Sequence, residues 1–333
     1  MNNENNTENI IPEKPKLTNS KIEILKHEAF NRLRKKYGLE DILNVMIDIN
    51  ASDVHLTSNE PISMTFRKEI LKTPFKTRPD EIQSFVAELT HSNAGLMKIY
   101  KPEEIDGSYV LRNYDTDEEF FFRYNIGLAM TEPDMTIRKL INEIPTFEYL
   151  QLTEEKGLPF VNEILNLNNG IYLVVGETGS GKTTTLVSII DKIMKMHSVK
   201  VITLEAPIEF YYKPSNYKDS IIKQKEIGRD TMSFLTGLRA AMRQAPDVIL
   251  VGEIRDKETA IAALQASQSG HMVLGTLHAN GPIDAKDRLF NMLEGQNGFE
   301  NSLRGAMFQK LYKDPKTGGV EVIRNWEIFN HED

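Results

Sequence analysis

Cysteine is absent from the 333-residue sequence, so disulfide bonds and thiolate-ligated metal sites are excluded. Long apolar segments are absent as well: no run approaches the roughly 18 residues of a membrane-spanning helix, and a membrane span is not expected. The sequence also lacks a basic excess, because 40 Lys and Arg residues stand against 48 Asp and Glu residues. This balance argues against a broad nucleic-acid-binding surface, although it is compatible with a local basic patch.

The first 20 residues are rich in Asn, Glu and Lys and contain no apolar core of the kind that a secretory signal needs. We therefore expect a disordered tail over residues 1–20 and a cytoplasmic protein. The length predicts two domains, and a hydrophobic content of 40% is sufficient for both of them to bury a core.

The most specific motif lies at residues 176–183, which read Gly-Glu-Thr-Gly-Ser-Gly-Lys-Thr. An apolar run suited to a buried strand precedes it at 171–175, and residues 184–196 follow with apolar side chains at helical spacing. A strand, this glycine pattern and a helix form the context of a phosphate-binding loop. A glycine-rich turn that binds nothing is the weaker alternative.

The residue types of this loop fit phosphate chemistry. Glycines without a Cβ let the backbone wrap around a phosphate and turn its N–H groups inward, at a helix N-terminus that favours negative charge. We expect Lys182 to reach the β- and γ-phosphates and the Thr183 hydroxyl to hold Mg²⁺. The predicted binding residues are Gly176, Thr178, Gly179, Ser180, Gly181, Lys182, Thr183 and Thr184.

The first half of the chain has the pattern of a small α+β domain. Apolar residues at helical spacing predict helices over 41–49 and 79–89, and alternating apolar and polar residues predict strands over 51–57 and 61–66. Residues 118–124, with three consecutive phenylalanines, predict a further strand. Two additional segments are a basic, helix-prone stretch over 21–37 and a hairpin turn at 67–69.

Strands and helices alternate from residue 171 onward, which predicts a parallel sheet covered by helices. The expected strands are 171–175, 199–204, 248–251 and 272–277, and the expected helices are 182–196, 231–244 and 256–268. The predicted organisation is a tail over 1–20, an N-terminal α+β domain over 21–138, a linker and first helix over 139–158, and an α/β domain over 159–333.

Carboxylates follow two of the expected strands. Glu253 comes just after the strand at 248–251, at the sheet edge where such folds bind ligands. It is interpreted as part of the Mg²⁺ shell or as a group that polarises water, in preference to a solvated strand-end acid. Glu205 and Glu209 lie four residues apart at the same edge and could orient an attacking water, but on spacing alone surface acids are the better interpretation.

Two histidines and two arginines complete the candidates. His271 and His278 bracket the strand at 272–277, where they could sense a γ-phosphate or be structural, and their spacing does not favour a metal site. Arg123 and Arg138 are ordinary surface arginines unless the first domain packs over a nucleotide site.

In this order, the segments resemble the signature boxes of the secretion ATPase superfamily, which includes the motors of type II secretion, type IV secretion and type IV pili. The resemblance covers residues from about 40 to 327. The boxes called Walker A, Asp box, Walker B and His box are matched by 176–183, 203–210, 245–256 and 270–280. The start of the family's N-terminal domain and its two arginine segments are matched by 51–56, 122–125 and 137–138.

The resemblance implies a RecA-like phosphate-loop NTPase domain preceded by a smaller PAS-like α+β domain. It implies a homohexamer that hydrolyses ATP with Mg²⁺ and turns the reaction into domain motion. It also implies that Lys182 and Thr183 bind phosphate and metal, that Glu205 is the catalytic acid and that Glu253 belongs to the metal site. The remaining residues that it assigns to the site are Glu209, His271, His278, Arg123 and Arg138.

Departures from the family pattern indicate which branch of the secretion ATPase superfamily the chain resembles. The Asp box usually has an aspartate at the position of Ala206. With alanine there, residues 205–210 are more similar to the box of the DotB/TraJ-like ATPases of type IVB secretion and conjugation. The four-cysteine module of type II and pilus-assembly motors is absent. Residues 247–250 and 275–278 are more similar to PilT-like retraction motors.

We therefore expect a type IVB secretion motor, recruited by protein partners to the cytoplasmic face of the inner membrane. A pilus-retraction motor is the first alternative. An inactive nucleotide-binding scaffold, motivated by Ala206, is the second, and a nucleic-acid translocase is disfavoured by the acidic balance.

Overall fold

The structure is a computed structural model that describes residues 31, 33, 37–66, 69–90, 104–113, 118–140, 143–294, 298–313 and 319–329. The tail expected over 1–20 and nearly all of the basic stretch over 21–37 lie outside these residues. The chain divides into two compact units, Met1–Ile105 with Asn125–Lys139 and Asp106–Tyr124 with Leu140–Asp333. The domain boundaries expected from the sequence stay a prediction.

The first sheet has six strands in the order β3-β2-β1-β6-β5-β4. β1 pairs antiparallel with both β2 and β6, and β2 pairs antiparallel with β3. The strands are β1 (Asp53–Thr57), β2 (Pro61–Phe66), β3 (Glu69–Lys76), β4 (Ile105–Asn113), β5 (Glu118–Ala129) and β6 (Glu132–Lys139). The strands predicted over 51–57, 61–66 and 118–124 are confirmed, and two residues of the predicted turn, 67 and 68, lie outside the described residues.

Two helices accompany these strands, α2 (Leu39–Asp48) and α3 (Pro79–Thr90). Both were predicted from their apolar faces, which are buried in the structure. The N-terminus of α2 is closed by the Asp41 carboxylate, which accepts a 2.8 Å hydrogen bond from the Gly38 N–H. This contact satisfies a backbone donor that a helix start otherwise leaves without a partner.

The second sheet has seven strands in the order β13-β12-β7-β11-β10-β8-β9. Every pairing is parallel except that of β12 with β13, which is antiparallel. The predicted parallel sheet is therefore confirmed. The strands are β7 (Gly170–Val175), β8 (Lys200–Glu205), β9 (Ile221–Glu226), β10 (Val248–Val251), β11 (Met272–Leu277), β12 (Leu303–Lys313) and β13 (Val320–Ile328).

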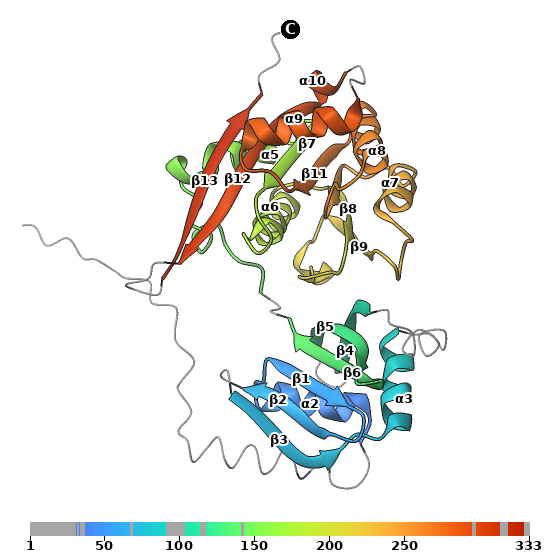
Figure 1. The fold of residues 1–333 in the computed structure, drawn as a ribbon. Coiled ribbons are helices and arrows are strands. Elements are labelled where there is room, and N and C mark those ends of the chain that lie inside the picture. Colours follow the sequence, from blue (N-terminus) through green and yellow to red (C-terminus); the bar gives the residue numbers. More distant parts are fainter. Residues whose placement is uncertain are drawn as a thin grey trace, which may run out of the picture. The chain divides into compact units, whose positions relative to one another are not determined.

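Helices cover both faces of this sheet (Figure 1). The α-helices are α5 (Leu158–Leu165), α6 (Lys182–Met196), α7 (Phe234–Met242), α8 (Lys257–Gln268), α9 (Pro282–Leu293) and α10 (Phe299–Ser302), and the 3₁₀ turns are η1 (Glu154–Lys156) and η2 (Pro214–Asn216). The three helices predicted in this half correspond to α6, α7 and α8. None of the helices in the described part of the chain has the length and apolar composition of a membrane-spanning segment.

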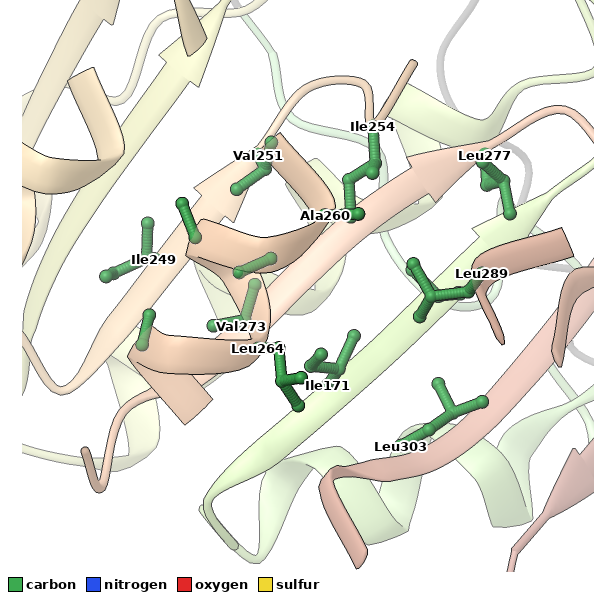
Figure 2. Packing of buried hydrophobic residues seen from close by; sticks show 14 of the residues in the cluster. Ile171, Ile249, Val251, Ile254, Ala260, Leu264, Val273, Leu277, Leu289 and Leu303 are labelled. Carbon is green, nitrogen blue, oxygen red and sulfur yellow. The ribbon is translucent and has the colours of Figure 1, made fainter. Parts of the chain in front are cut away.

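The buried side chains alternate between two cores because successive strand residues point to opposite faces. On β7, Ile171 packs with residues of α8 and α9, whereas Tyr172 packs with residues of α5 and α6. Figure 2 shows the first core, where Ile171, Val273 and Leu264 meet between the sheet and α8. Each fully buried aliphatic side chain of this kind contributes about 1.5–3 kcal/mol relative to an exposed one. The two cores pack against both faces of the sheet, and several of the predicted site residues, among them Glu205, Glu253 and His278, lie at or just after the carboxyl ends of its strands.

Candidate functional site

The loop between β7 and α6 has the backbone shape of an anion-binding turn. Gly176, Gly179 and Gly181 have φ angles of +146°, +76° and +82°, which side chains disfavour. A Cβ on Gly176 would lie 2.2 Å from the backbone oxygen of Gln309, so only glycine fits there. α6 begins at Lys182 without a side-chain cap, which leaves its first backbone N–H groups free for an anion.

The Lys182 ammonium lies against this loop. Its Nζ donates to the carbonyl oxygens of Gly176 and Glu177 at 2.9 and 2.8 Å. Burial lowers the pKa of Lys182, and the carboxylates of Glu253 and Glu209 partly oppose that shift. The cation is therefore placed beside the loop within reach of two carboxylates, as expected of a lysine that contacts phosphates.

Glu253 follows β10 and is surrounded by cationic and basic groups. Its Oε2 lies 2.5 Å from Nη2 of Arg255, and its Oε1 lies 3.3 Å from Nε2 of His278. Burial opposes ionisation of Glu253, but Arg255, His278 and Lys182 outweigh it and lower the pKa of the carboxyl group. His278 also contacts the phosphate loop, since its Nδ1 lies 3.1 Å from the Gly176 oxygen. Glu253 is thus an ionised carboxylate tied through His278 to the loop.

Glu205 ends the neighbouring strand β8 in a different environment. Its side chain is buried, and Oε1 accepts hydrogen bonds from Oγ1 of Thr203 at 2.6 Å and from Nε2 of Gln224 at 3.1 Å. Its Oε2 has no hydrogen-bond partner among the described residues. Burial raises the pKa of Glu205 to about 7, although the bonds from Thr203 and Gln224 act in the opposite direction. A carboxylate with a free oxygen and a pKa near neutrality suits general-base chemistry.

These groups line one cavity of about 340 Å³. The cavity lies at the carboxyl ends of β7, β8, β10 and β11, where parallel sheets bind ligands. Arg123 of β5, which belongs to the same compact unit, lines it as well. The predicted site residues along its wall are Arg123, Thr178, Gly179, Lys182, Thr183, Glu205, Glu209, Glu253 and His278.

Other predicted residues lie outside this wall. His271 precedes β11 at the opposite end of that strand from His278, and its Nδ1 lies 2.8 Å from the Pro246 oxygen. Arg138 belongs to the other compact unit, where its Nε donates to the Asp53 carboxylate at 2.6 Å. Ser180 is a buried residue of the phosphate loop itself, and Thr184 lies in the first turn of α6. The catalytic and binding roles of all the predicted site residues, His271 and Arg138 included, stay predictions.

The family described as "Type II/IV secretion system protein" matches residues 33–322. The chain belongs to this family. The family resemblance noted in the sequence, the fold class and the expectation of an ATPase are thereby confirmed.

Individual relatives of this secretion ATPase agree with the assignment. It is 35% identical over 295 residues to the uncharacterized protein YggR of Escherichia coli K12, covering 86% of this chain and 85% of that protein. The structure of the ATPase DotB of Legionella pneumophila is similar with a TM-score of 0.79 at 27% identity, covering 89% of this chain and 82% of that one. The pilus retraction motor PilT with bound ADP has a TM-score of 0.72 at 34% identity, covering 89% and 84%. The chain is therefore a member of the group of secretion and pilus ATPases.

The structure adds three residues of this secretion ATPase that the sequence patterns did not single out. Thr203 and Gln224 bind Glu205, and Gln309 contacts the phosphate loop through both its backbone and its side chain. Thr203 lies inside the Asp box, so its position two residues before Glu205 on the same strand was an available signal. Gln224 and Gln309 lie on β9 and β12, which carry no motif and were not predicted.

Proposed function

We propose that this chain is a Mg²⁺-dependent ATPase that assembles as a homohexamer and powers a type IV secretion system of the type IVB branch. The observation that supports this most is the shared cavity, because Lys182 at the start of α6 and Glu205, Glu253 and His278 at or after the ends of β8, β10 and β11 all line it. A phosphate-binding loop, a general base and an ionised metal-binding carboxylate in one cavity are the parts that ATP hydrolysis requires.

The residues divide the chemistry between them. Lys182 exchanges its two carbonyl partners for phosphate oxygens, and the free backbone N–H groups of α6 bind the same phosphates. Glu205 accepts a proton from the attacking water at Oε2, the oxygen that has no partner among the described residues. This oxygen is shielded from solvent, so the step needs the nucleotide to bring a water within reach of it.

The side chains around the cavity fit Mg²⁺. Thr183 contributes a hydroxyl oxygen and Glu253 a carboxylate with a lowered pKa, and both line the cavity. Mg²⁺ prefers hard oxygen ligands and usually takes one or two from the protein. When bound, the ion would neutralise charge on the phosphates. Glu253 is held for this role by Arg255 and His278.

The roles of the remaining predicted site residues depend on nucleotide binding and on assembly of the hexamer. We place Glu209 and His278 around the phosphates, and we assign Arg123, Arg138 and His271 to interactions that assembly or nucleotide binding completes. The motor would be recruited to the cytoplasmic face of the inner membrane by machinery proteins, and its domain motion would drive transfer.

A pilus-retraction motor is the second candidate, supported by the 34% identity to the retraction motor PilT. The two candidates differ in what the cell loses. Introduction of Glu205→Gln in the native host should block substrate transfer without changing surface pili if the secretion proposal holds. Accumulation of unretracted pili with normal transfer would instead select the retraction motor.

The activity itself is tested by measuring steady-state ATP turnover over a range of protein concentrations, with mass determined by light scattering on the same samples. We expect the rate per subunit to rise as a six-subunit species forms, and Lys182→Ala to abolish it. Turnover by Lys182→Ala at the wild-type rate would remove the phosphate-loop assignment. A hexamer that binds ATP with only background turnover would favour an inactive scaffold.

A further inference from the structure

A buried polar cluster lies behind the phosphate loop, on the β12–β13 hairpin. Gln309 of β12 and Arg324 of β13 are directly opposite each other in the antiparallel pairing, and they are only 2% and 8% exposed. Nε of Arg324 donates to Oε1 of Gln309 at 2.8 Å. Directly opposed side chains on paired strands are close enough to interact, and this hydrogen bond joins the two residues into one unit.

Gln309 connects this unit to the phosphate loop. Its Nε2 donates to the Ser180 carbonyl at 2.6 Å, and its Oε1 accepts from Oγ1 of Thr185 at 2.8 Å. Ser180 belongs to the loop and Thr185 to the first turns of α6. A Cβ on Gly181 would lie 2.8 Å from Nε2 of Gln309, so the amide is packed directly against the loop.

The orientation of the Gln309 amide is set by its two most selective neighbours. A glutamine amide has one donor end and one acceptor end, and a rotation of 180° exchanges them. The guanidinium of Arg324 can only donate and the Ser180 carbonyl can only accept, so a rotated amide would face a donor with a donor and an acceptor with an acceptor. Thr185 does not select an orientation, because a hydroxyl group can donate or accept.

Arg324 is poorly explained as a stabiliser of the fold. In the described part of the chain no carboxylate pairs with it, its Nη2 has no hydrogen-bond partner, and its Nη1 makes only 3.5 Å contacts with the oxygens of Gln151 and Lys156. Burial lowers the pKa of Arg324 to about 10, so it stays charged at neutral pH. A buried cation without a counter-charge costs free energy that an apolar residue of similar size would not.

We propose that Arg324, acting through Gln309, is a positioning residue for the phosphate loop. It fixes the amide so that Nε2 holds the Ser180 carbonyl, and this contact keeps the loop in the shape that binds nucleotide phosphates. The inference rests on the proposed nucleotide-binding function and adds to it a control of the loop by the C-terminal hairpin.

The test is a double-mutant cycle on the full-length protein, with MgADP affinity measured by titration calorimetry. Arg324→Met should raise the Kd about tenfold, which corresponds to about 1.4 kcal/mol, while the midpoint of thermal unfolding stays at or above that of the wild type. In the Gln309→Met background the same change should alter the Kd by less than about twofold, because Arg324 then has no amide to orient. Arg304→Met on β12 is the matched control, since Arg304 instead donates to the Asn169 oxygen.

Two other outcomes of the double-mutant cycle count against the proposal. An unchanged Kd in folded Arg324→Met overturns it, and an equal loss in both backgrounds overturns it in favour of a direct effect of the charge. If Arg324→Met does not fold, Gln309→Glu replaces it: this variant keeps an acceptor for Arg324 but turns a second acceptor toward Ser180. An unchanged Kd there overturns the proposal, and a raised Kd with an undiminished unfolding midpoint supports it. Failure of the wild type to bind MgADP removes the proposed function instead.

A second readout follows the loop itself. In nucleotide-free Arg324→Met, hydrogen exchange at the amides of residues 177–186 should be faster than in the wild type, with exchange in β10 unchanged. Equal exchange in the loop would contradict the positioning role.

Discussion

Two glutamates at the ends of neighbouring strands have opposite environments. β8 and β10 are paired in register, with Leu204 opposite Val251, so Glu205 and Glu253 lie at the same edge of the sheet, one position apart along the strands. Glu205 is buried with neutral hydrogen-bond partners, and burial, helped by the nearby carboxylates of Glu209 and Glu226, raises its pKa to about 7. Glu253 lies between Arg255 and His278, and its pKa is lowered despite partial burial.

The difference shows that the role of a carboxylate depends on the groups around it, and not on its position at the edge of the sheet. Two carboxylates whose environments move their pKa values apart are suited to different tasks in one reaction. The group with the raised pKa can take up a proton near neutral pH, and the group that stays ionised can bind a cation. A substitution of one glutamate should therefore change one of these tasks and leave the other intact.

The largest effect is expected for Glu205→Gln. Loss of the proposed general base should lower kcat by about 10²- to 10⁴-fold, while the Kd for MgADP changes little because the phosphate loop is intact. Turnover is measured on the hexamer, and binding by calorimetry. Glu258→Gln on α8, an exposed position, is the matched control and should behave as the wild type does. Wild-type turnover by Glu205→Gln would show that Glu205 is not the general base.

Glu253→Gln should affect the metal rather than the proton. If Glu253 binds Mg²⁺, directly or through water, the Mg²⁺ concentration at half-maximal turnover should rise about 10- to 100-fold. ADP binding measured in EDTA should be unchanged, and Glu205→Gln should leave the Mg²⁺ requirement of the residual turnover where it is. A Mg²⁺ midpoint that moves equally in both variants would contradict the division of roles.

The pH profile sharpens the comparison further. With a pKa of about 7, Glu205 is a proton acceptor only above that pH, so kcat should rise as the pH is raised through 7. Thr203→Val removes a hydrogen bond that favours the charged form, which should raise the pKa of Glu205 and move this rise to higher pH. Glu253→Gln should not move it. A profile flat across neutral pH would exclude Glu205 as the titrating group.

The phosphate loop and Glu253 could be placed from the sequence because their signals are local. The spacing of Glu205 alone favoured a surface acid, which is wrong because its side chain is buried. The glycine pattern of 176–183, the strand before it and the helix after it are contiguous, and Glu253 directly follows a short apolar strand. The periodicity or the motif of such segments can be recognised without knowledge of the tertiary fold. The same holds for the apolar faces of α2 and α3, which the structure buries as predicted.

Gln224 and Gln309 could not be predicted as partners of these residues, because they come from distant strands without a pattern. β9 is an edge strand whose less exposed positions include the polar Gln224 and Glu226, so the apolar–polar alternation that would identify a strand is missing. The bond from Gln309 to Ser180 joins residues 129 positions apart. The pKa of Glu205 follows from such contacts and from burial, so its position was predictable from the sequence and its environment was not.

The smallest expected effect is on stability. The unfolded carboxyl of Glu205 has a pKa near 4.5 and the folded one near 7, so the folded state binds a proton more tightly. Burying this carboxylate therefore costs nothing below about pH 4.5, costs increasingly more between 4.5 and 7, and costs its full amount above 7. Glu205→Gln should accordingly raise the free energy of unfolding by on the order of 1–3 kcal/mol at pH 8 and hardly at all at pH 5. Thermal unfolding of both proteins at the two pH values measures the difference, and Glu253→Gln should show no such gain at pH 8. An equal gain for Glu205→Gln at both pH values would mean that packing, and not the buried charge, separates the two glutamates.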